Sequence, residues 1–208
     1  MKKRLVWNFE IDTEHAEHFP LLPPATKEPL RWEARYFWRG EDMVCLHSLN
    51  DDYLDLSRYE SKHREDTYHV LAAFNFNIKV RRGELLYKPL LEETALLLGF
   101  GKKIPLHEQP PDMVLPGTDG LSARQLLELV EKNSNIITVE KDALVLKLAD
   151  EPTIKLELSR LKMGSDIFFS ACIEGRAQGL VQAIAEHVFP GQMPSDYVHF
   201  LKQQVYHD

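Results

Sequence analysis

The 208-residue sequence lacks the features by which secreted proteins, membrane proteins and cysteine-based metal proteins are recognised. Its only two cysteines, Cys45 and Cys172, form no CxxC motif and no Cys/His set at metal-binding spacing, so we expect two free, buried thiols in a reducing compartment. The basic start at Met1 to Arg4 is followed by no signal-peptide core, and no apolar run reaches the roughly eighteen residues of a membrane span. The sequence therefore predicts a cytoplasmic protein that does not enter a membrane, and it leaves a homodimer open.

The sequence also lacks the short motifs of several enzyme classes. There is no P-loop, no glycine-rich dinucleotide fingerprint and no GxSxG elbow, which argues against the nucleotide-dependent enzymes and serine hydrolases that use them. Gly99 to Lys103 (GFGKK) is too short for such a fingerprint; we interpret it as a turn with a solvated basic end, with a lid over an anion-binding mouth as the alternative.

Excess basic charge is absent as well. The chain has 25 Lys and Arg against 32 Asp and Glu, a formal net charge of -7. General nucleic-acid-binding surfaces need clustered Lys and Arg, so this balance argues against one. Any anion-binding site must therefore be local.

What the sequence does contain is a series of segments in which apolar and charged residues alternate. In Leu30 to Trp38 (LRWEARYFW), three aromatic residues and Ala34 alternate with charged residues and Phe37. A period of two is typical of a strand with one charged face, and the same pattern returns further along the chain. We interpret Trp32, Tyr36 and Trp38 as outer-layer packing beneath helices, in preference to a stacking platform for bases.

Patterning and turn residues predict the order of elements. The first part has a strand within Arg4 to Ile11, a Pro-rich connector at Phe19 to Pro29, a strand at Leu30 to Trp38 with Met43 to Leu49 as its hairpin partner, and an ill-defined polar segment at Asn50 to Asp66. The middle part has strands at Tyr68 to Ala73, Asn77 to Arg82 and Glu84 to Leu90, a loop at Gly99 to Gly120, and a helix with a capping box at Leu121 to Ser134. The last part has strands at Ile136 to Glu140, Ala143 to Ala149, Thr153 to Leu161 and Asp166 to Glu174, followed by two C-terminal helices.

This order predicts an α+β fold: an antiparallel β-barrel with flanking and C-terminal helices, in one domain spanning residues 1–208, with the barrel core at about 30–174 and the C-terminal helices at 175–206. The apolar faces of the strands need cover, whereas the charged faces face either solvent or a common lumen. Basic residues are in excess on these faces, so a lumen would take an anion, and a linear polyphosphate suits Arg and Lys on neighbouring strands. The candidate phosphate-binding residues are Arg35, Lys79, Arg81, Lys88, Lys147 and Lys155.

Several of these segments also match motifs in order along the chain. They are Arg31 to Arg35 (RWEAR), Ile78 to Arg81 (IKVR), Leu86 to Pro89 (LYKP), Ile154 to Leu158 (IKLEL), Ser170 to Gly175 (SACIEG) and the helix start at Ser195 to Leu201 (SDYVHFL). They resemble the CYTH, or triphosphate tunnel metalloenzyme, superfamily as a divergent member. That superfamily includes inorganic, thiamine and RNA triphosphatases and class IV adenylyl cyclases. The resemblance spans roughly Leu30 to Val205.

The resemblance implies a triphosphate-containing, small-molecule ligand and Mg²⁺ or Mn²⁺ held by carboxylates. Glu33, Glu157 and Glu174 stand where the family's metal-binding and catalytic acids would be. The chain departs from the motifs at two places, however. The first strand keeps one acid of ExExK, and Cys172 replaces the first acid of the last ExE.

Three hypotheses follow from these observations. The first is metal-dependent hydrolysis of inorganic or organic triphosphate, with Glu33, Glu157 and Glu174 on the metal. The second is a non-catalytic module of the same fold that binds polyphosphate or a nucleotide. The third is a scaffold in which charges such as Glu33 and Arg81 only pair across strands.

Two weaker sites are interpreted structurally. His15 and His18 stand three residues apart, as metal ligands on a helix can, but they lie in a polar N-terminal segment and are interpreted as solvated. Cys172 is interpreted as a small residue near the lumen and not as a nucleophile, because no histidine stands beside it in the sequence to lower its pKa.

Overall fold

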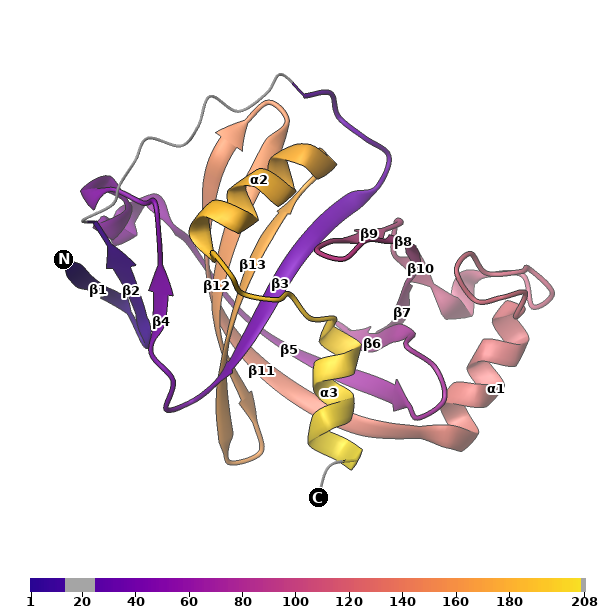
Figure 1. The fold of residues 1–208 in the computed structure, drawn as a ribbon. Coiled ribbons are helices and arrows are strands. Elements are labelled where there is room, and N and C mark those ends of the chain that lie inside the picture. The colour runs from indigo at the N-terminus through magenta and orange to yellow at the C-terminus, as the bar shows by residue number, and fades with distance from the viewer. Residues whose placement is uncertain (14–24, 207–208) are drawn as a thin grey trace.

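Ten strands form one antiparallel sheet that curls into a half-barrel (Figure 1), in a computed structural model that describes residues 1–13 and 25–206. The order across the sheet is β10-β7-β6-β5-β11-β12-β13-β3-β9-β8. Its strands are β3 (Arg31–Arg39), β5 (Glu60–Leu71), β6 (Asn77–Arg81), β7 (Glu84–Lys88), β8 (Leu90–Glu93), β9 (Leu98–Phe100), β10 (Ile104–Pro105), β11 (Ser134–Asp150), β12 (Thr153–Met163) and β13 (Asp166–Gly175). The predicted antiparallel, barrel-like α+β fold is confirmed.

The two longest strands exceed their predicted lengths. β11 is one continuous strand of 17 residues, so the prediction of two strands with a break near Lys141 is wrong. No Gly or Pro stands at the expected break, and Lys141 is paired with Leu161 on one side and Arg64 on the other. β5 begins at Glu60, inside the segment that the sequence leaves undefined, after two short 3₁₀ helices at Asp51–Leu54 and Leu56–Arg58. Polar residues form this strand because one side faces a cavity and the other faces solvent.

A second, three-stranded sheet is formed by β1 (Lys2–Val6), β2 (Phe9–Asp12) and β4 (Val44–Leu46). The predicted hairpin between Leu30–Trp38 and Met43–Leu49 is therefore wrong, since β4 pairs in parallel with β2. The first predicted strand is also divided, by a turn at Trp7, which has a φ of 45°. The apolar residues of β2 and β4 pack into the main core, which outweighs local hairpin pairing.

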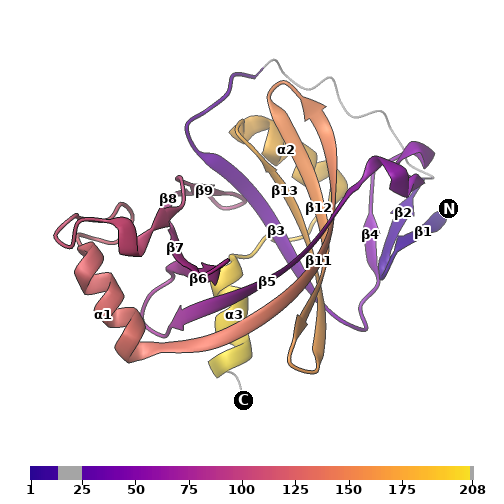
Figure 2. The same ribbon diagram turned by 180° about the vertical axis from the view of Figure 1, so that it is seen from behind.

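The convex side of the large sheet carries the main hydrophobic core. Helix α2 (Gln178–Val188) packs on β3 and β13 there, together with the small sheet (Figure 2). Trp32 and Tyr36 are 2% and 4% exposed in this core, and Trp38 packs against it. The prediction that these aromatic residues form outer-layer packing is confirmed.

Helix α1 (Ala123–Asn133) covers the far end of the sheet. It begins with the predicted capping box: the Ser122 hydroxyl accepts from the Gln125 backbone N–H at 3.3 Å, and the Gln125 side chain accepts from the Ser122 N–H at 2.8 Å. Its apolar side packs on Ile78 and Tyr87, from the outer faces of β6 and β7. The short 3₁₀ helix Leu106–Glu108 contacts β7 in the same region.

Helix α3 (Tyr197–Tyr206) lies on the concave side of the large sheet. Tyr197, Phe200 and Leu201 pack against Tyr68 of β5 and Leu161 of β12, which point to that side. The helix therefore fills one end of the concave face with apolar contacts. Charged residues occupy the other end.

None of the helices in the described part of the chain has the length and apolar character of a membrane span.

Candidate functional site

The charged end of the concave face encloses a cavity of about 460 Å³. Alternating residues of β3, β5, β6, β7, β11, β12 and β13 point into it, because successive side chains of a strand face opposite sides of a sheet. The cavity is lined by twelve basic side chains, and we call it the basic cavity. They are Arg31, Arg35, Lys62, Arg64, Lys79, Arg81, Lys88, Lys102, Lys103, Lys141, Lys155 and Arg176. Three carboxylates line it, those of Glu33, Glu157 and Glu174.

Most of the candidate residues predicted from the sequence meet in this cavity. Eight line it, namely Glu33, Arg35, Lys79, Arg81, Lys88, Lys155, Glu157 and Glu174. Lys147 does not. It is exposed and lines an adjoining cleft that shares Lys155 and Glu174 with the cavity. Its predicted role in phosphate binding stays a prediction.

Sequence reasoning missed several cavity residues, above all Lys62, Arg64 and Lys141. Lys62 and Arg64 lie in the segment that was left undefined, and Lys141 lies at the expected break in β11. A signal was present in the sequence, because Lys62, Arg64, Asp66 and Tyr68 repeat with the period of a strand. Lys102 and Lys103 lie at the cavity as well, as the lid interpretation of that segment requires.

One anchor of the basic cavity is Asp66, whose side chain is 3% exposed. Arg81 Nε donates to its Oδ1 at 2.6 Å, and Lys79 Nζ donates to its Oδ2 at 3.0 Å. Burial alone would raise the pKa of Asp66, but the hydrogen bonds from Arg81 and the charge of Lys79 outweigh it and hold that pKa well below its usual range. Arg81 therefore pairs with Asp66, and not with Glu33 as the scaffold hypothesis expects.

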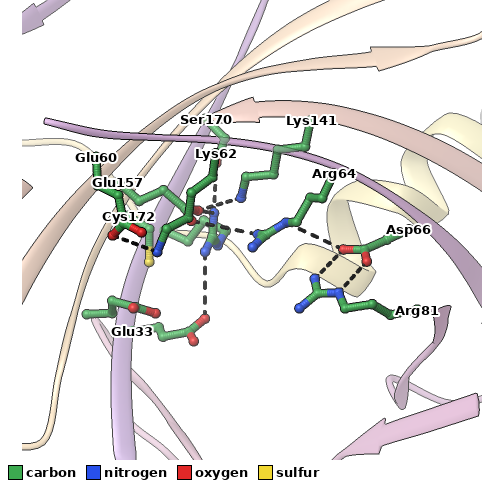
Figure 3. A network of polar contacts seen from close by, with 12 residues as sticks. Glu33, Glu60, Lys62, Arg64, Asp66, Arg81, Lys141, Glu157, Ser170 and Cys172 are labelled. Atoms are coloured by element: carbon green, nitrogen blue, oxygen red, sulfur yellow. Dashed lines mark hydrogen bonds and ion pairs between the residues drawn. The ribbon is translucent and has the colours of Figure 1, made fainter. Parts of the chain in front are cut away.

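A second anchor is Glu157, which lies among three cations (Figure 3). Lys141 Nζ donates to Glu157 Oε1, and Arg35 Nη1 donates to the same oxygen at 3.2 Å. Burial would raise the pKa of Glu157, but the charges of Lys141, Arg35 and Arg64 lower it well below its usual range. Arg35 also donates to the Ser170 hydroxyl at 3.3 Å.

Arg64 lies between these two anchors without a hydrogen bond to either. Its Nε is 3.7 Å from Asp66 Oδ2, and its Nη2 is 3.7 Å from Glu157 Oε2. The Nε is buried and has no hydrogen-bond partner among the described residues. A buried N–H without an acceptor is costly, so this group favours an acceptor from a ligand.

The remaining two carboxylates stand opposite each other, because Glu33 of β3 is paired with Glu174 of β13. Each has a cation beside it. Lys88 Nζ donates to Glu33 Oε1 at 2.6 Å and lies 3.5 Å from the centre of the Phe100 ring, and Arg31 Nη1 donates to Glu174 Oε1 at 3.1 Å. Burial would raise the pKa of Glu33, but the charge of Lys88 keeps it lowered.

Four cations at the cavity have no carboxylate within ion-pair distance in the described parts of the chain. They are Lys102, Lys103, Lys155 and Arg176. Partial burial and repulsion from the neighbouring cations lower the pKa of Lys103 to about 8. These side chains are therefore available to a bound anion without breaking an existing pair.

Two deeper lysines are held in surroundings that disfavour their charge. Burial lowers the pKa of Lys141 to about 7, even though Glu157 partly offsets it. Burial likewise lowers the pKa of Lys79 to about 8, against the opposing effect of Asp66. An anion placed beside either lysine would favour the charged form.

The carboxylates of the cavity do not fit a divalent metal ion. Glu33, Glu157 and Glu174 each accept a hydrogen bond from Lys or Arg, and in the described residues they do not form a set of three ligand atoms within 4.8 Å of one another. Mg²⁺ and Mn²⁺ prefer several oxygen ligands around one point. Binding of Mg²⁺ or Mn²⁺ by these carboxylates stays a prediction.

Cys172 is fully buried beside this network, as the sequence interpretation expects. Burial raises the pKa of its thiol well above its usual range, although the charge of Arg35 opposes the shift. A protonated thiol is a weak nucleophile, which agrees with the structural interpretation of this residue. His15 and His18 lie outside the described residues.

Comparisons with known proteins do not identify a family for this chain. No protein-family model matches the sequence, and no curated protein matches it. Among solved structures, the chain is similar to a Bacillus halodurans protein described as a "putative adenylate cyclase", with a TM-score of 0.42 and 10% identity over 85% of this chain and 97% of that one. Because the TM-score and the sequence identity are both low, this similarity says nothing about what the basic cavity binds.

Proposed function

We propose that this protein binds a linear, phosphate-rich anion in the basic cavity, such as inorganic triphosphate or an organic triphosphate. One observation carries the proposal. Of the 25 Lys and Arg residues in a chain of net charge -7, twelve line a single cavity, together with three of the 32 Asp and Glu residues. A surface that evenly mixed the two signs would place more acidic than basic groups there.

The energetics of this arrangement favour a ligand. Cations brought together in a partly buried space repel one another. Each cation also loses hydrating water, and this loss must be offset by pairing with a carboxylate or by a bound anion. Within residues 1–13 and 25–206 the carboxylates pair with only part of the set, since four cations lack such a partner and the Arg64 Nε lacks an acceptor. Phosphate oxygens would supply both the charge and the acceptors.

The distribution of the cations favours a chain of phosphates over a single one. They come from β3, β5, β6, β7, β11 and β12 and from the segments around Lys102 and Arg176, so they surround an extended space. Arg binds two phosphate oxygens at once, while Lys contributes a point charge. The volume of about 460 Å³ falls in the range of roughly 300–1,000 Å³ that is typical of small-molecule sites.

The order of motifs that resembles the triphosphate tunnel superfamily supports the same ligand class. It supports hydrolysis less well, because the carboxylates that would hold a metal are engaged by Lys and Arg. Of the two functions predicted from the sequence for such a ligand, the non-catalytic binding module is therefore the one that we propose.

Calorimetric titration and thermal unfolding with tripolyphosphate in EDTA test the proposal. We expect binding of tripolyphosphate, with phosphate and pyrophosphate binding more weakly. Tripolyphosphate should stabilise the fold by about 2.7 kcal/mol at a ligand concentration a hundredfold above Kd.

Lys155→Ala and Arg176→Ala should each weaken binding by about ten- to a hundredfold, because each removes a hydrogen bond from a charged side chain to the anion. Lys162→Ala on the exposed side of β12 is the matched control.

The alternatives predict other results. Equal affinity in the wild-type chain and the Arg176→Ala and Lys155→Ala variants would remove the basic cavity as the site. Phosphate release that starts on adding Mg²⁺ or Mn²⁺ would restore metal-dependent hydrolysis. A loss of binding in Lys147→Ala would extend the site into the adjoining cleft.

A further inference from the structure

A second cluster of ligand-type side chains lies outside the basic cavity, on the small sheet. Asp12 of β2, Cys45 of β4 and His47, which follows β4, each offer one ligand atom, and these three atoms lie within 4.8 Å of one another. It is the only such set of three His, Cys, Asp or Glu residues in the described parts of the chain. Neither the proposed anion-binding function nor the sequence motifs use it.

The register of the small sheet brings the three residues together. β2 and β4 are parallel, with Glu10 opposite Cys45 and Ile11 opposite Leu46. Cys45 of β4 and His47, directly after β4, are two residues apart. This spacing puts both side chains on one side of an extended chain, next to the face of β2 that carries Asp12.

The opposite face of this sheet is anchored in the core. Phe9, Ile11 and Leu46 are fully buried there, and the His47 backbone N–H donates to Val188 O of α2 at 3.0 Å. Because the core holds one face of the sheet, the ligand-bearing face is held as well. Asp12, Cys45 and His47 themselves are half-buried.

We propose that Asp12, Cys45 and His47 bind one Zn²⁺ ion. Thiolate, imidazole and carboxylate are the ligands that zinc takes in proteins, and the soft sulfur selects against Mg²⁺ and Ca²⁺. Bonds of roughly 2.0–2.3 Å around a tetrahedral ion place ligand atoms about 3.5 Å apart, so small side-chain rotations suffice to close this set. Water or Glu10, which stands opposite Cys45, supplies the fourth position.

The ion would join two segments that are distant in sequence. β2 and β4 are separated by more than thirty residues, and the small sheet has only three short strands. A metal that binds the folded chain and not the unfolded one stabilises it. The site therefore has a structural role that is independent of anion binding.

Cobalt and zinc titrations of the full chain test this site. The protein is purified without a histidine tag and with its natural amino terminus, because the Met1 amine lies 3.4 Å from Asp12 Oδ1, and it is stripped of metal with EDTA. We expect one Co²⁺ per chain with a sulfur-to-cobalt charge-transfer band, displacement of Co²⁺ by Zn²⁺, and a higher melting temperature with Zn²⁺.

Three variants assign the ligands. Cys45→Ser should abolish the charge-transfer band, and His47→Gln should weaken Zn²⁺ binding at least tenfold, in line with the loss of a metal ligand or its support. Cys172→Ala, which removes the other thiol, should keep the band. Circular dichroism is used to check that each variant is folded.

The proposal is overturned by a wild-type chain without a charge-transfer band, or by Zn²⁺ affinity that is the same in Cys45→Ser and His47→Gln as in the wild type. It is also overturned if a His15→Gln, His18→Gln double variant loses the metal while Cys45→Ser keeps it. Tripolyphosphate binding is measured on Cys45→Ser and His47→Gln and should be unchanged, so failure of one proposal does not affect the other.

Discussion

Glu157 shows at the level of one residue how the basic cavity is held together in the absence of a ligand. Its carboxylate is 11% exposed and faces Lys141, Arg35 and Arg64. The same carboxylate that offsets their repulsion in the free protein also reduces the positive potential that a ligand would meet. Folding stability and anion affinity are therefore opposed at this residue.

Glu157→Gln should separate these two effects. Removing one partner from a buried charge cluster costs about 3–5 kcal/mol, so the unfolding free energy in guanidinium chloride should fall by about that amount. Tripolyphosphate affinity should rise in the same variant, because three cations lose a competing carboxylate. Glu140→Gln on the exposed side of β11 should change neither quantity, and a Glu157→Gln variant with weaker affinity would mean that Glu157 holds the site for the ligand.

The buried lysines predict a pH dependence. Burial lowers the pKa of Lys141 to about 7 and that of Lys79 to about 8 in the folded chain, from the ordinary lysine value of 10.5. Between about pH 7 and 10 the unfolded chain therefore binds more protons than the folded one, so these lysines make folding stability rise with pH.

Anion binding should have the opposite dependence. A bound polyanion favours charged lysines, so protons are taken up on binding, and affinity should fall by up to about tenfold per pH unit for each lysine above its pKa. Calorimetry from pH 7 to 9, in buffers of different ionisation enthalpy, measures this uptake. Lys141→Met should bind more weakly and with a flatter profile, and an unchanged profile would place the ligand away from Lys141.

At the scale of elements, α3 packs on one end of the concave face and borders the basic cavity. Tyr197 lines the basic cavity, stacks on Tyr68 at 5.0 Å between ring centres, and lies 5.5 Å from the Arg35 guanidinium. Behind it, Phe200 is 5% exposed and stacks on Phe37 at 4.0 Å. The helix thus supports the floor of the cavity through aromatic packing.

Phe200→Ala should loosen that floor. Truncating a buried Phe costs about 3–5 kcal/mol, so the chain should unfold at lower denaturant concentration. Tyr197 should also lose support and hold the Arg35 guanidinium in place less firmly. We expect lower tripolyphosphate affinity in calorimetry. His199→Ala on the exposed side of α3 should stay within about 0.5 kcal/mol of the wild type. Wild-type affinity in a folded Phe200→Ala protein would show that the floor needs no support from α3.

At the scale of the whole molecule, charge is segregated. The chain is acidic overall, yet nearly half of its basic residues line one cavity. Long-range attraction of an extended polyanion such as a DNA duplex depends on the exposed surface, whereas a small anion can enter the cavity.

This segregation predicts selective binding by size. Double-stranded DNA should not bind at physiological salt, while tripolyphosphate should bind and weaken as KCl is raised, because screening is felt at the cavity mouth. Electrophoretic mobility and calorimetric titrations measure the two. DNA binding as strong as that of tripolyphosphate would indicate an exposed basic surface in place of the cavity.

The alternation that builds the sheet and much of the site could be predicted from the sequence. Glu33, Arg35, Lys79, Arg81 and Lys88 could be placed on one face from their spacing, because the period of two is a local property of a strand. The capping box of α1 was equally local. The first part of β5, Glu60 to Asp66, was harder to assign, because no apolar residue marks a buried face there and the only signal is the period of two in Lys62, Arg64 and Asp66.

Which charges meet and which elements pair depends on contacts that form only in the folded chain. β4 joins β2 instead of β3, because burial of its apolar residues in the shared core outweighs the proximity of a hairpin. Asp66 and Lys141 joined the charge network of the basic cavity through the pairing of β5 and β11, which is set by strand register and not by sequence distance. The engagement of Glu33, Glu157 and Glu174 by cations, and the meeting of Asp12 with Cys45 and His47, likewise depend on contacts between residues far apart in the chain, which the order of residues along the chain does not reveal.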